Sequence, residues 1–165
     1  MKSIALLFAC IITSTAIAAE PQMFEVAVIQ VSNQAGQTTL ESLKLSATDG
    51  KAATANLLQQ HQYIHACTAT TQEKATFNTG ISASIRPVSV DSSGNILADV
   101  DVKYSLLESM GTFKSNACQV QLPALKEFRT DARYQVGTKS PVQLGELRIP
   151  GNAGLRYEVW LFAKN

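Results

Sequence analysis

Two neighbouring runs of alternating apolar and polar residues constrain the fold of this chain most strongly. The runs cover residues 81–90 and 96–106, and the four residues Asp-Ser-Ser-Gly at 91–94 separate them. Alternation with a period of two predicts strands with one buried face, and a short loop ending in glycine predicts that the two strands pair as an antiparallel hairpin. The chain is therefore expected to contain at least one β-hairpin with one buried and one wetter face.

Matching apolar to apolar side chains across this loop fixes the register. With Val90 opposite Asn95, Arg86 lies against Asp99 on the wetter face, where the two are expected to form a structural ion pair. A slip of one residue would place the apolar set of one strand beside the polar set of the other. The expected buried face pairs Ile85 with Val100 and Ala83 with Val102, and it includes Tyr104.

The rest of the chain also favours short strands. Runs rich in β-branched, aromatic and other apolar residues lie at 24–31, 43–47, 128–136, 142–149 and 155–163, between turn-forming residues at 33–36, 49–50, 137–140 and 150–154. Residues 111–116 predict a loop, and Pro123 predicts a break. The predicted fold is mainly β, an antiparallel sheet or sandwich of short strands and hairpins.

Residues 52–66 are ambiguous. Several alanines and leucines favour a short helix around residues 52–60, whereas the surrounding pattern favours a strand. The strand is the preferred interpretation, and the helix stays open as the alternative.

The first 19 residues have the composition of a signal peptide. Lys2 provides a positive charge, residues 4–12 are apolar, and small residues at 16–19 suit cleavage after Ala18 or Ala19. Residues 13–15, Thr-Ser-Thr, interrupt the run and disfavour an uncleaved anchor, and Phe8 disfavours a lipoprotein box ending at Cys10. Residues 20–165 are then expected to form a single exported domain, periplasmic or secreted, for which outer-membrane association stays open.

The charge balance after cleavage disfavours nucleic acid as a partner. The chain has 14 basic and 13 acidic residues, and removing residues 1–19 removes Lys2 and no acid, which leaves 13 of each. Nucleic-acid binding depends on clustered Lys and Arg, and the sequence shows no such cluster. No later segment is long and apolar enough for a transmembrane helix.

Two cysteines remain after cleavage. Cys67 and Cys118 are an even pair in a compartment that permits oxidation, which predicts a disulfide between them. Two buried free thiols are the alternative.

The sequence offers little catalytic chemistry. His61, His65 and Cys67 are the only cluster that suggests metal ligands, but on a strand the two histidines would be about 13 Å apart. There is no Gly-x-Ser-x-Gly nucleophile elbow and no phosphate-binding glycine motif. Residues 91–95 lack the twelfth-position acid of a calcium loop, since Val102 stands there. No catalytic residue, cofactor or metal is therefore expected.

Three segments, in the correct order, resemble the core of secretins, the outer-membrane channels of bacterial secretion and pilus systems. Residues 79–89 carry a Gly-x-x-x-x-apolar-x-Pro strand, which the turn at Gly94 and the alternating strand follow. Upstream, residues 43–53 are similar to a strand, a turn and a small-residue strand of that core. Downstream, residues 128–137 and 142–147 resemble its paired strands with an apolar-Leu-Gly-Gly-Leu signature. The resemblance spans about residues 40–163 and implies a secretin-core-like β-domain.

The departures from this family limit what the resemblance implies. Glu146 replaces the second glycine of the signature, and the proline-rich Leu-Gly-Asp segment expected after it is absent. The chain is too short for the ring-building domains of secretins, and its sequence shows no convincing pair of hairpins suited to a membrane pore. The resemblance therefore implies a shortened, stand-alone relative of the β-domain without pore formation.

These observations lead to one preferred function and two alternatives. The preferred hypothesis is a non-enzymatic envelope β-domain that binds or scaffolds an envelope protein of a secretion or pilus system, with edge strands as one means of contact. The alternatives are a small extracytoplasmic hydrolase or metal-binding protein, with a site assembled from distant residues such as His65, and a secreted adhesin-like domain.

Overall fold

The computed structural model describes residues 20–115, 118–151 and 154–164, and this part of the chain is all β. Its strands are β1 (Gln22–Ser32), β2 (Gly36–Ala47), β3 (Ala53–Cys67), β4 (Gln72–Val90), β5 (Ile96–Ser115), β6 (Cys118–Val136), β7 (Val142–Arg148) and β8 (Leu155–Lys164). The predicted β fold is confirmed. The predicted signal peptide lies outside the described residues, among which no helix is long and apolar enough to cross a membrane.

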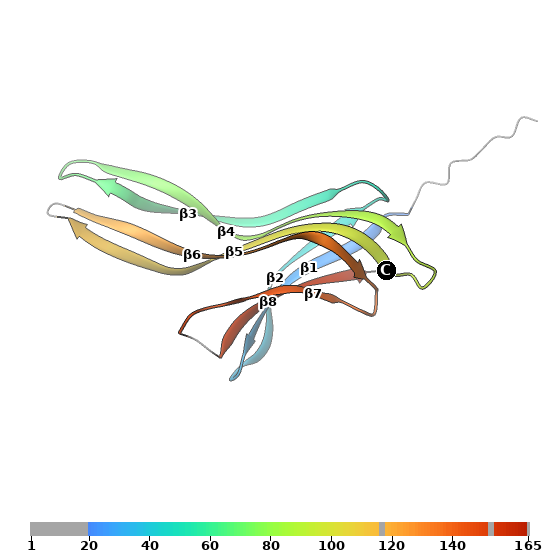
Figure 1. Ribbon diagram of the computed structural model, residues 1–165. Coiled ribbons are helices and arrows are strands. Elements are labelled where there is room, and N and C mark those ends of the chain that lie inside the picture. Colours follow the sequence, from blue (N-terminus) through green and yellow to red (C-terminus); the bar gives the residue numbers. More distant parts are fainter. Residues whose placement is uncertain (1–19, 116–117, 152–153, 165) are drawn as a thin grey trace, which may run out of the picture.

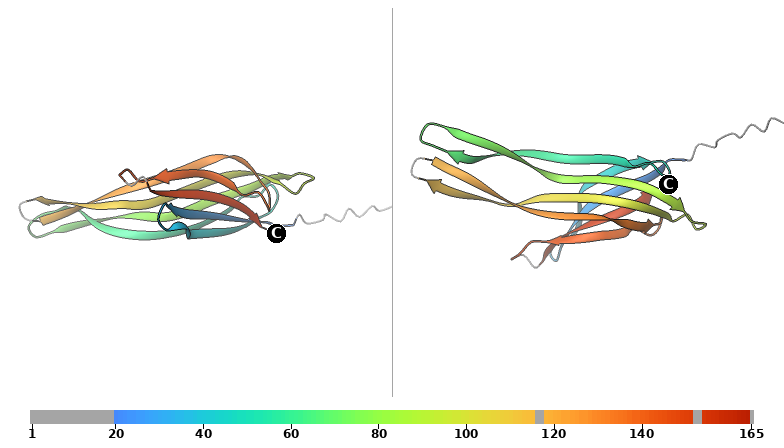
Figure 2. Two further views of the ribbon diagram at one scale, coloured as in Figure 1. Left: turned by 90° about the horizontal axis from the view of Figure 1, so that it is seen from below. Right: turned by 45° about the horizontal axis from the view of Figure 1, so that its top comes forward.

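The eight strands form two antiparallel sheets of four strands each (Figure 1). The first sheet has the order β2-β1-β8-β7, and the second has the order β3-β4-β5-β6. All the neighbouring strands in both sheets run antiparallel. The second sheet is the longer one and continues well past the edge of the first (Figure 2).

The alternative of a helix over residues 52–60 is wrong. These residues belong to the coil before β3 and to β3 itself, which pairs with β4 from Ala53 to Cys67. Alanine and leucine favour helices only weakly, and the ladder to a strand that follows in the chain outweighs this preference.

The hydrophobic core lies between the two sheets. The first sheet contributes five fully buried residues, which are Phe24, Val26 and Val28 of β1 and Val159 and Leu161 of β8. The other sheet contributes the predicted face of the hairpin, which is confirmed: Ile85 and Val102 are 0% exposed, Val100 is 1% and Tyr104 is 4%. Alternation along β1, β5 and β8 thus brings two apolar faces together, as expected for packed sheets.

The register of the β4 and β5 hairpin agrees with the sequence at its centre and differs at its end. Ile85 lies opposite Val100, and Ala83 lies opposite Val102. Val90, however, lies opposite Ile96, not opposite Asn95, because the pairing shifts between Pro87 and Ser89. The shift inserts one extra residue into β4 and so forms a β-bulge. The pattern of apolar and polar residues next to the loop does not reveal this extra residue.

A long extension of the second sheet departs from the sandwich. The pairing of β4 with β5 ends at Gly80 and Ser105, and beyond this point each strand continues in a hairpin of its own. We call residues 58–79, 106–115 and 118–125 the extension; its two hairpins, β3 with β4 and β5 with β6, project side by side (Figures 1 and 2).

The extension corrects two predictions from the sequence. Gly111 and its neighbours up to Ser115 continue β5 instead of forming a loop, and Pro123 lies within β6, opposite Met110. A proline is tolerated there because β6 is an edge strand, which needs no second ladder of hydrogen bonds.

Gly80 allows the extension to leave the sandwich. Its φ is +111°, and a Cβ at this position would lie 2.2 Å from the carbonyl oxygen of Leu57 on β3. Only glycine combines this backbone conformation with so close an approach of the neighbouring strand. Gly80 is also the glycine of the Gly-x-x-x-x-apolar-x-Pro motif. The close approach of β3 therefore explains why the first position of this motif is a glycine.

Candidate interaction surfaces

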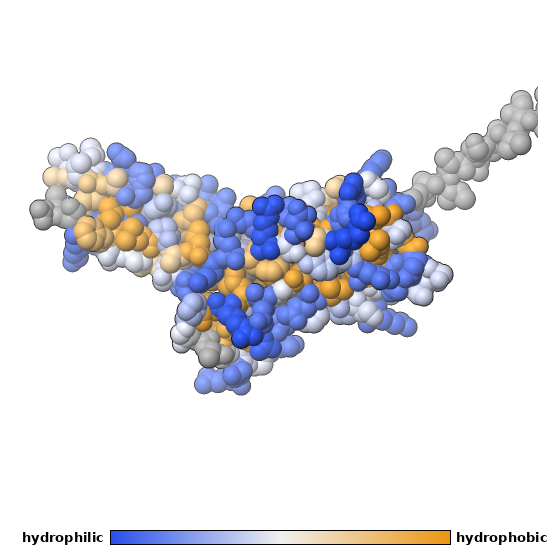
Figure 3. Space-filling model, in the orientation of Figure 1, coloured by the Kyte–Doolittle hydropathy of each residue, from blue (hydrophilic) through white to orange (hydrophobic). Residues whose placement is uncertain are grey.

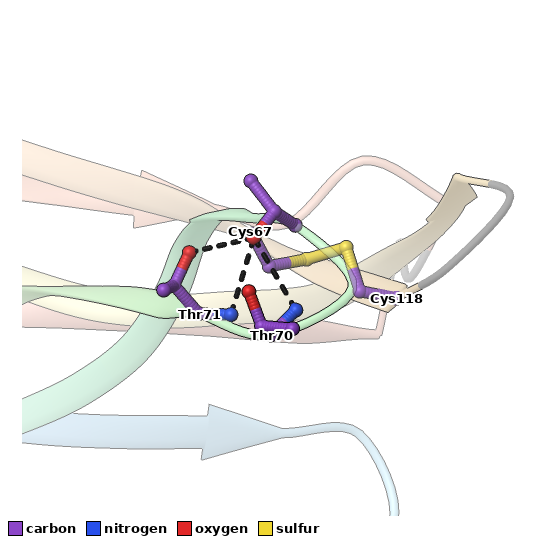
Figure 4. The surroundings of a disulfide bond; sticks show 5 residues. Cys67, Thr70, Thr71 and Cys118 are labelled. Atoms are coloured by element: carbon purple, nitrogen blue, oxygen red, sulfur yellow. Dashed lines mark hydrogen bonds between the residues drawn. A yellow bond between two sulfur atoms is a disulfide. The ribbon is translucent and has the colours of Figure 1, made fainter.

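A disulfide joins the ends of the two projecting hairpins. Cys67 at the end of β3 is bonded to Cys118 at the start of β6, with their Cα atoms 6.2 Å apart (Figure 4). A hydrogen bond from the backbone N–H of Ile64 to Oε1 of Gln121, 2.9 Å long, connects the same two strands. Because β3 and β6 are the two edges of the sheet, these links tie the edges together at the end of the extension.

The turn after Cys67 satisfies its own polar groups. The hydroxyl of Thr68 accepts a hydrogen bond from the backbone N–H of Thr71 at 3.1 Å and from that of Thr70 at 3.4 Å (Figure 4). It also lies 2.7 Å from the hydroxyl of Thr71. Side-chain oxygens that bind nearby backbone N–H groups stabilise tight turns. The turn between β3 and β4 is therefore held by its own hydrogen bonds.

The hairpin of β5 and β6 exposes apolar side chains on the extension. Phe113 is 59% exposed and Leu122 is 56% exposed, and Val120 lies directly opposite Phe113. Side chains opposite each other, or two residues apart on one strand, share a face of the hairpin, so these three residues form one apolar surface. We call Phe113, Val120 and Leu122 the apolar patch; apolar surface on the projecting hairpins is visible in Figure 3.

The two histidines lie on the other hairpin of the extension. The ring of His61 stacks on that of Phe77 with centroids 4.9 Å apart, and its Nε2 lies 2.8 Å from the hydroxyl of Thr79. His65 lies 3.8 Å from the carboxylate of Glu73. In residues 20–115, 118–151 and 154–164, no three or more His, Cys, Asp or Glu residues gather in a geometry that could hold a metal ion.

Arg86 and Asp99 lie opposite each other and are joined by a third residue. Arg86 donates to Asp99 at 2.5 Å, and Arg133 on β6 donates to the second oxygen of the same carboxylate at 2.7 Å. The hydrogen bond from Arg133, followed by the one from Arg86, lowers the pKa of Asp99 to about 2. The sequence alone does not indicate Arg133, because its pairing with Asp99 depends on the long ladder between β5 and β6.

The network at Asp99 predicts a loss of stability in acid. The pKa of Asp99 in the folded state lies below its ordinary value of 3.8. The ionised carboxylate therefore contributes fully to the free energy of unfolding above pH 3.8, and this contribution disappears as the pH falls towards about 2. A carbon-13 NMR titration of the Asp99 carboxyl group should show the low pKa, and Arg133→Gln should raise it. An unchanged pKa in this variant would contradict the assignment.

The segment of β7 that resembles the apolar-Leu-Gly-Gly-Leu signature keeps its first glycine, Gly145, and has Glu146 in place of the second. A Cβ at Gly145 would lie 2.4 Å from Cε2 of Phe128, so the first glycine leaves room for an aromatic ring of β6. Glu146, which stands in place of the second glycine, is exposed and pairs with Arg148 at 2.7 Å and with Arg156 at 3.9 Å. The departure from the family signature is therefore accommodated on the surface.

Two stacked antiparallel sheets, one of them extended by paired hairpins, define this molecule as an all-β protein. No protein-family model matches the chain, and no curated protein matches its sequence significantly.

Among solved structures, the chain is similar to the secretin domain of InvG from the Salmonella SPI-1 injectisome, with a TM-score of 0.46 and 10% identity over 87% of this chain and 60% of that chain. It is also similar to the V. cholerae type IV competence pilus secretin PilQ, with a TM-score of 0.42 and 11% identity over 87% of this chain and 54% of that chain. The chain thus spans less than two thirds of either structure. Both structures are secretins, the class that the sequence also resembles.

Proposed function

We propose that this protein is a non-enzymatic domain of the bacterial cell envelope that binds or scaffolds a component of a secretion or pilus system. The apolar patch on the extension carries the proposal, because Phe113 and Leu122 are each more than half exposed on a hairpin that projects from the sandwich. Exposed apolar surface of this kind is typical of protein contacts. The choice of a secretion or pilus component follows from the secretin resemblance in the sequence.

The structure of the extension supports a role in binding rather than in catalysis. The disulfide between Cys67 and Cys118 holds the two hairpins together, so the apolar patch is presented by a preorganised element. Preorganisation lowers the entropy cost of binding. The proposal includes export of residues 20–165 as one domain after removal of the signal peptide.

Replacing Phe113 and Leu122 by serine should abolish capture of the partner without unfolding the protein. Both side chains are exposed, so the free energy of unfolding should change by about 0.5 kcal/mol or less per site. The measurement is chemical crosslinking in envelope fractions, followed by mass spectrometry to identify the proteins that are crosslinked to this chain. The same spectra should show that the mature chain begins at Ala19 or Glu20.

The matched control replaces Val90 and Leu40 by serine, since these residues are 52% and 43% exposed and lie outside the extension. This variant should capture the same secretion or pilus components as the native protein. Equal capture by both double variants, or capture of no such component by the native protein, would refute the proposal.

A further inference from the structure

The outer face of the first sheet carries two aromatic side chains along β8. Val159 and Leu161 are fully buried between the two sheets. Successive residues of a strand point to opposite faces, so Trp160 and Phe162 lie on the face that points away from the second sheet (Figure 1). Both side chains are partly exposed. We call Trp160 and Phe162 the aromatic strip.

The carboxylates beside the aromatic strip are already paired within this face. Glu158 is buried, and it accepts hydrogen bonds from Nε1 of Trp160 at 2.9 Å and from Nε of Arg156 at 2.8 Å. Oε2 of Glu25 on β1 lies 2.9 Å from Nζ of Lys164. These two acids are therefore neutralised by neighbouring groups and contribute little negative charge to the surface.

The basic side chains on this face are more exposed than the acids with which they pair. The side chain of Arg148 is 74% exposed and that of its partner Glu146 is 35% exposed. The side chain of Lys164 is 50% exposed, whereas that of Glu25 is 19% exposed. Arg148 lies opposite Arg156, which is about 26 Å from Lys164 along the extended strand. The face therefore presents positive charge at both ends of the aromatic strip.

We infer that this face binds an extended segment of a partner protein that has acidic residues at both ends and apolar residues between them. The acidic residues complement the basic groups at Arg148, Arg156 and Lys164, and the apolar residues pack on the aromatic strip. Tryptophan and arginine are enriched among the residues that dominate protein–protein binding. This surface is separate from the apolar patch on the extension, so the inference does not depend on the proposed function.

Other occupants of this face fit its charge or its shape less well. Residues 1–19 contain Lys2 and no acid, so this apolar segment would bring like charge to the face. The apolar patch of a second copy lies beside residues 118–125, which also contain no acid. A membrane surface favours apolar side chains that insert among the lipids, whereas both rings of the aromatic strip are partly covered within the face.

The fluorescence of Trp160 reports binding at this face directly, because the chain has a single tryptophan. The probe is a synthetic peptide of about ten residues, long enough to span the strip, with aspartates at both ends and leucine and phenylalanine between them. Titration of the native exported protein at low ionic strength should give a saturable change in fluorescence. The same peptide with lysine in place of aspartate should bind at least about tenfold more weakly.

Two double variants test whether the basic groups of this face select the peptide. Arg148→Gln combined with Lys164→Gln should raise the dissociation constant of the acidic peptide by about fivefold or more, because each end of the strip loses a positive charge. The matched control is Arg129→Gln combined with Lys103→Gln on the second sheet. The side chains of these two residues are 66% and 48% exposed, and each is also paired with an acid. The control should change the dissociation constant by less than about twofold.

Three results would overturn the inference. The first is the absence of a saturable change with the acidic peptide, or equal or tighter binding of the lysine peptide. The second is an equal effect of the two double variants. The third is a larger change in Trp160 fluorescence with phosphatidylglycerol vesicles than with the acidic peptide, which would identify the face as a membrane-binding surface.

Discussion

Replacing Val100 by aspartate should remove a large part of the stability of the protein. Val100 is 1% exposed and lies opposite Ile85 in the core between the two sheets. A carboxylate at this position would be buried among apolar side chains without a partner, which costs about 4 to 5 kcal/mol or more. Because typical domains are stable by about 5–15 kcal/mol, urea unfolding followed by circular dichroism should show a much lower midpoint for this variant than for the native protein.

The neighbouring residue provides the matched control for this variant. Asp101 lies on the opposite face of β5, where its nearest charged partner is Arg129 at 3.5 Å, and about half of its side chain is exposed. Asp101→Asn should therefore change the free energy of unfolding by less than about 1 kcal/mol. A more destabilising effect of Asp101→Asn than of Val100→Asp would show that the faces of β5 are inverted.

The sandwich could be predicted from the sequence because its signals are local. The residues on either side of the loop at 91–94 alternate over most of their length, and alternation together with a short loop determines which face of each strand is buried. The pairing of Ile85 with Val100 follows from these residues alone. The shift at the end of the hairpin could not be predicted in this way, since a bulge leaves both strands with strand-like composition.

The extension could not be predicted, because its strands are defined by their partners. Residues near Gly111 and Pro123 have the composition of a loop, and the ladder between β5 and β6 is what makes them strands. For β3 the strand was the preferred interpretation, but its alanines and leucines left a helix open as the alternative, and the pairing with β4 decides between them. In each case a contact distant in sequence outweighed a weak local preference.

The candidate surfaces were predicted only in part for the same reason. The cysteine count indicates a bond between Cys67 and Cys118, but it does not show that the bond lies at the end of a projection. The apolar patch was missed because Phe113 falls in the segment that was expected to be a loop, and Leu122 stands next to a proline. The apolar residues Val120 and Leu122, separated by Gln121, were the available signal for a strand, and the neighbouring Pro123 obscured it.

Replacing Cys67 and Cys118 together by serine should destabilise the protein and loosen the extension first. The disulfide links residues 51 positions apart, and closing a loop of this size stabilises the folded state by about 4 kcal/mol in the chain-entropy model. Beyond Gly80 and Ser105 each hairpin has a ladder only within itself, so the disulfide acts together with contacts between β3 and β6, such as the hydrogen bond from Ile64 to Gln121, to hold the two hairpins side by side.

Hydrogen exchange resolved by residue measures where the loss occurs. Backbone amides of residues 72–79 and 118–125 should exchange much faster in the double serine variant, whereas those of Val100 and Val102, which pair with β4 and β6 inside the sandwich, should change less. The control is the native protein after reduction of the disulfide, which should behave like the variant. Equal protection of the extension with and without the disulfide would mean that packing between the hairpins, rather than the covalent bond, holds them side by side.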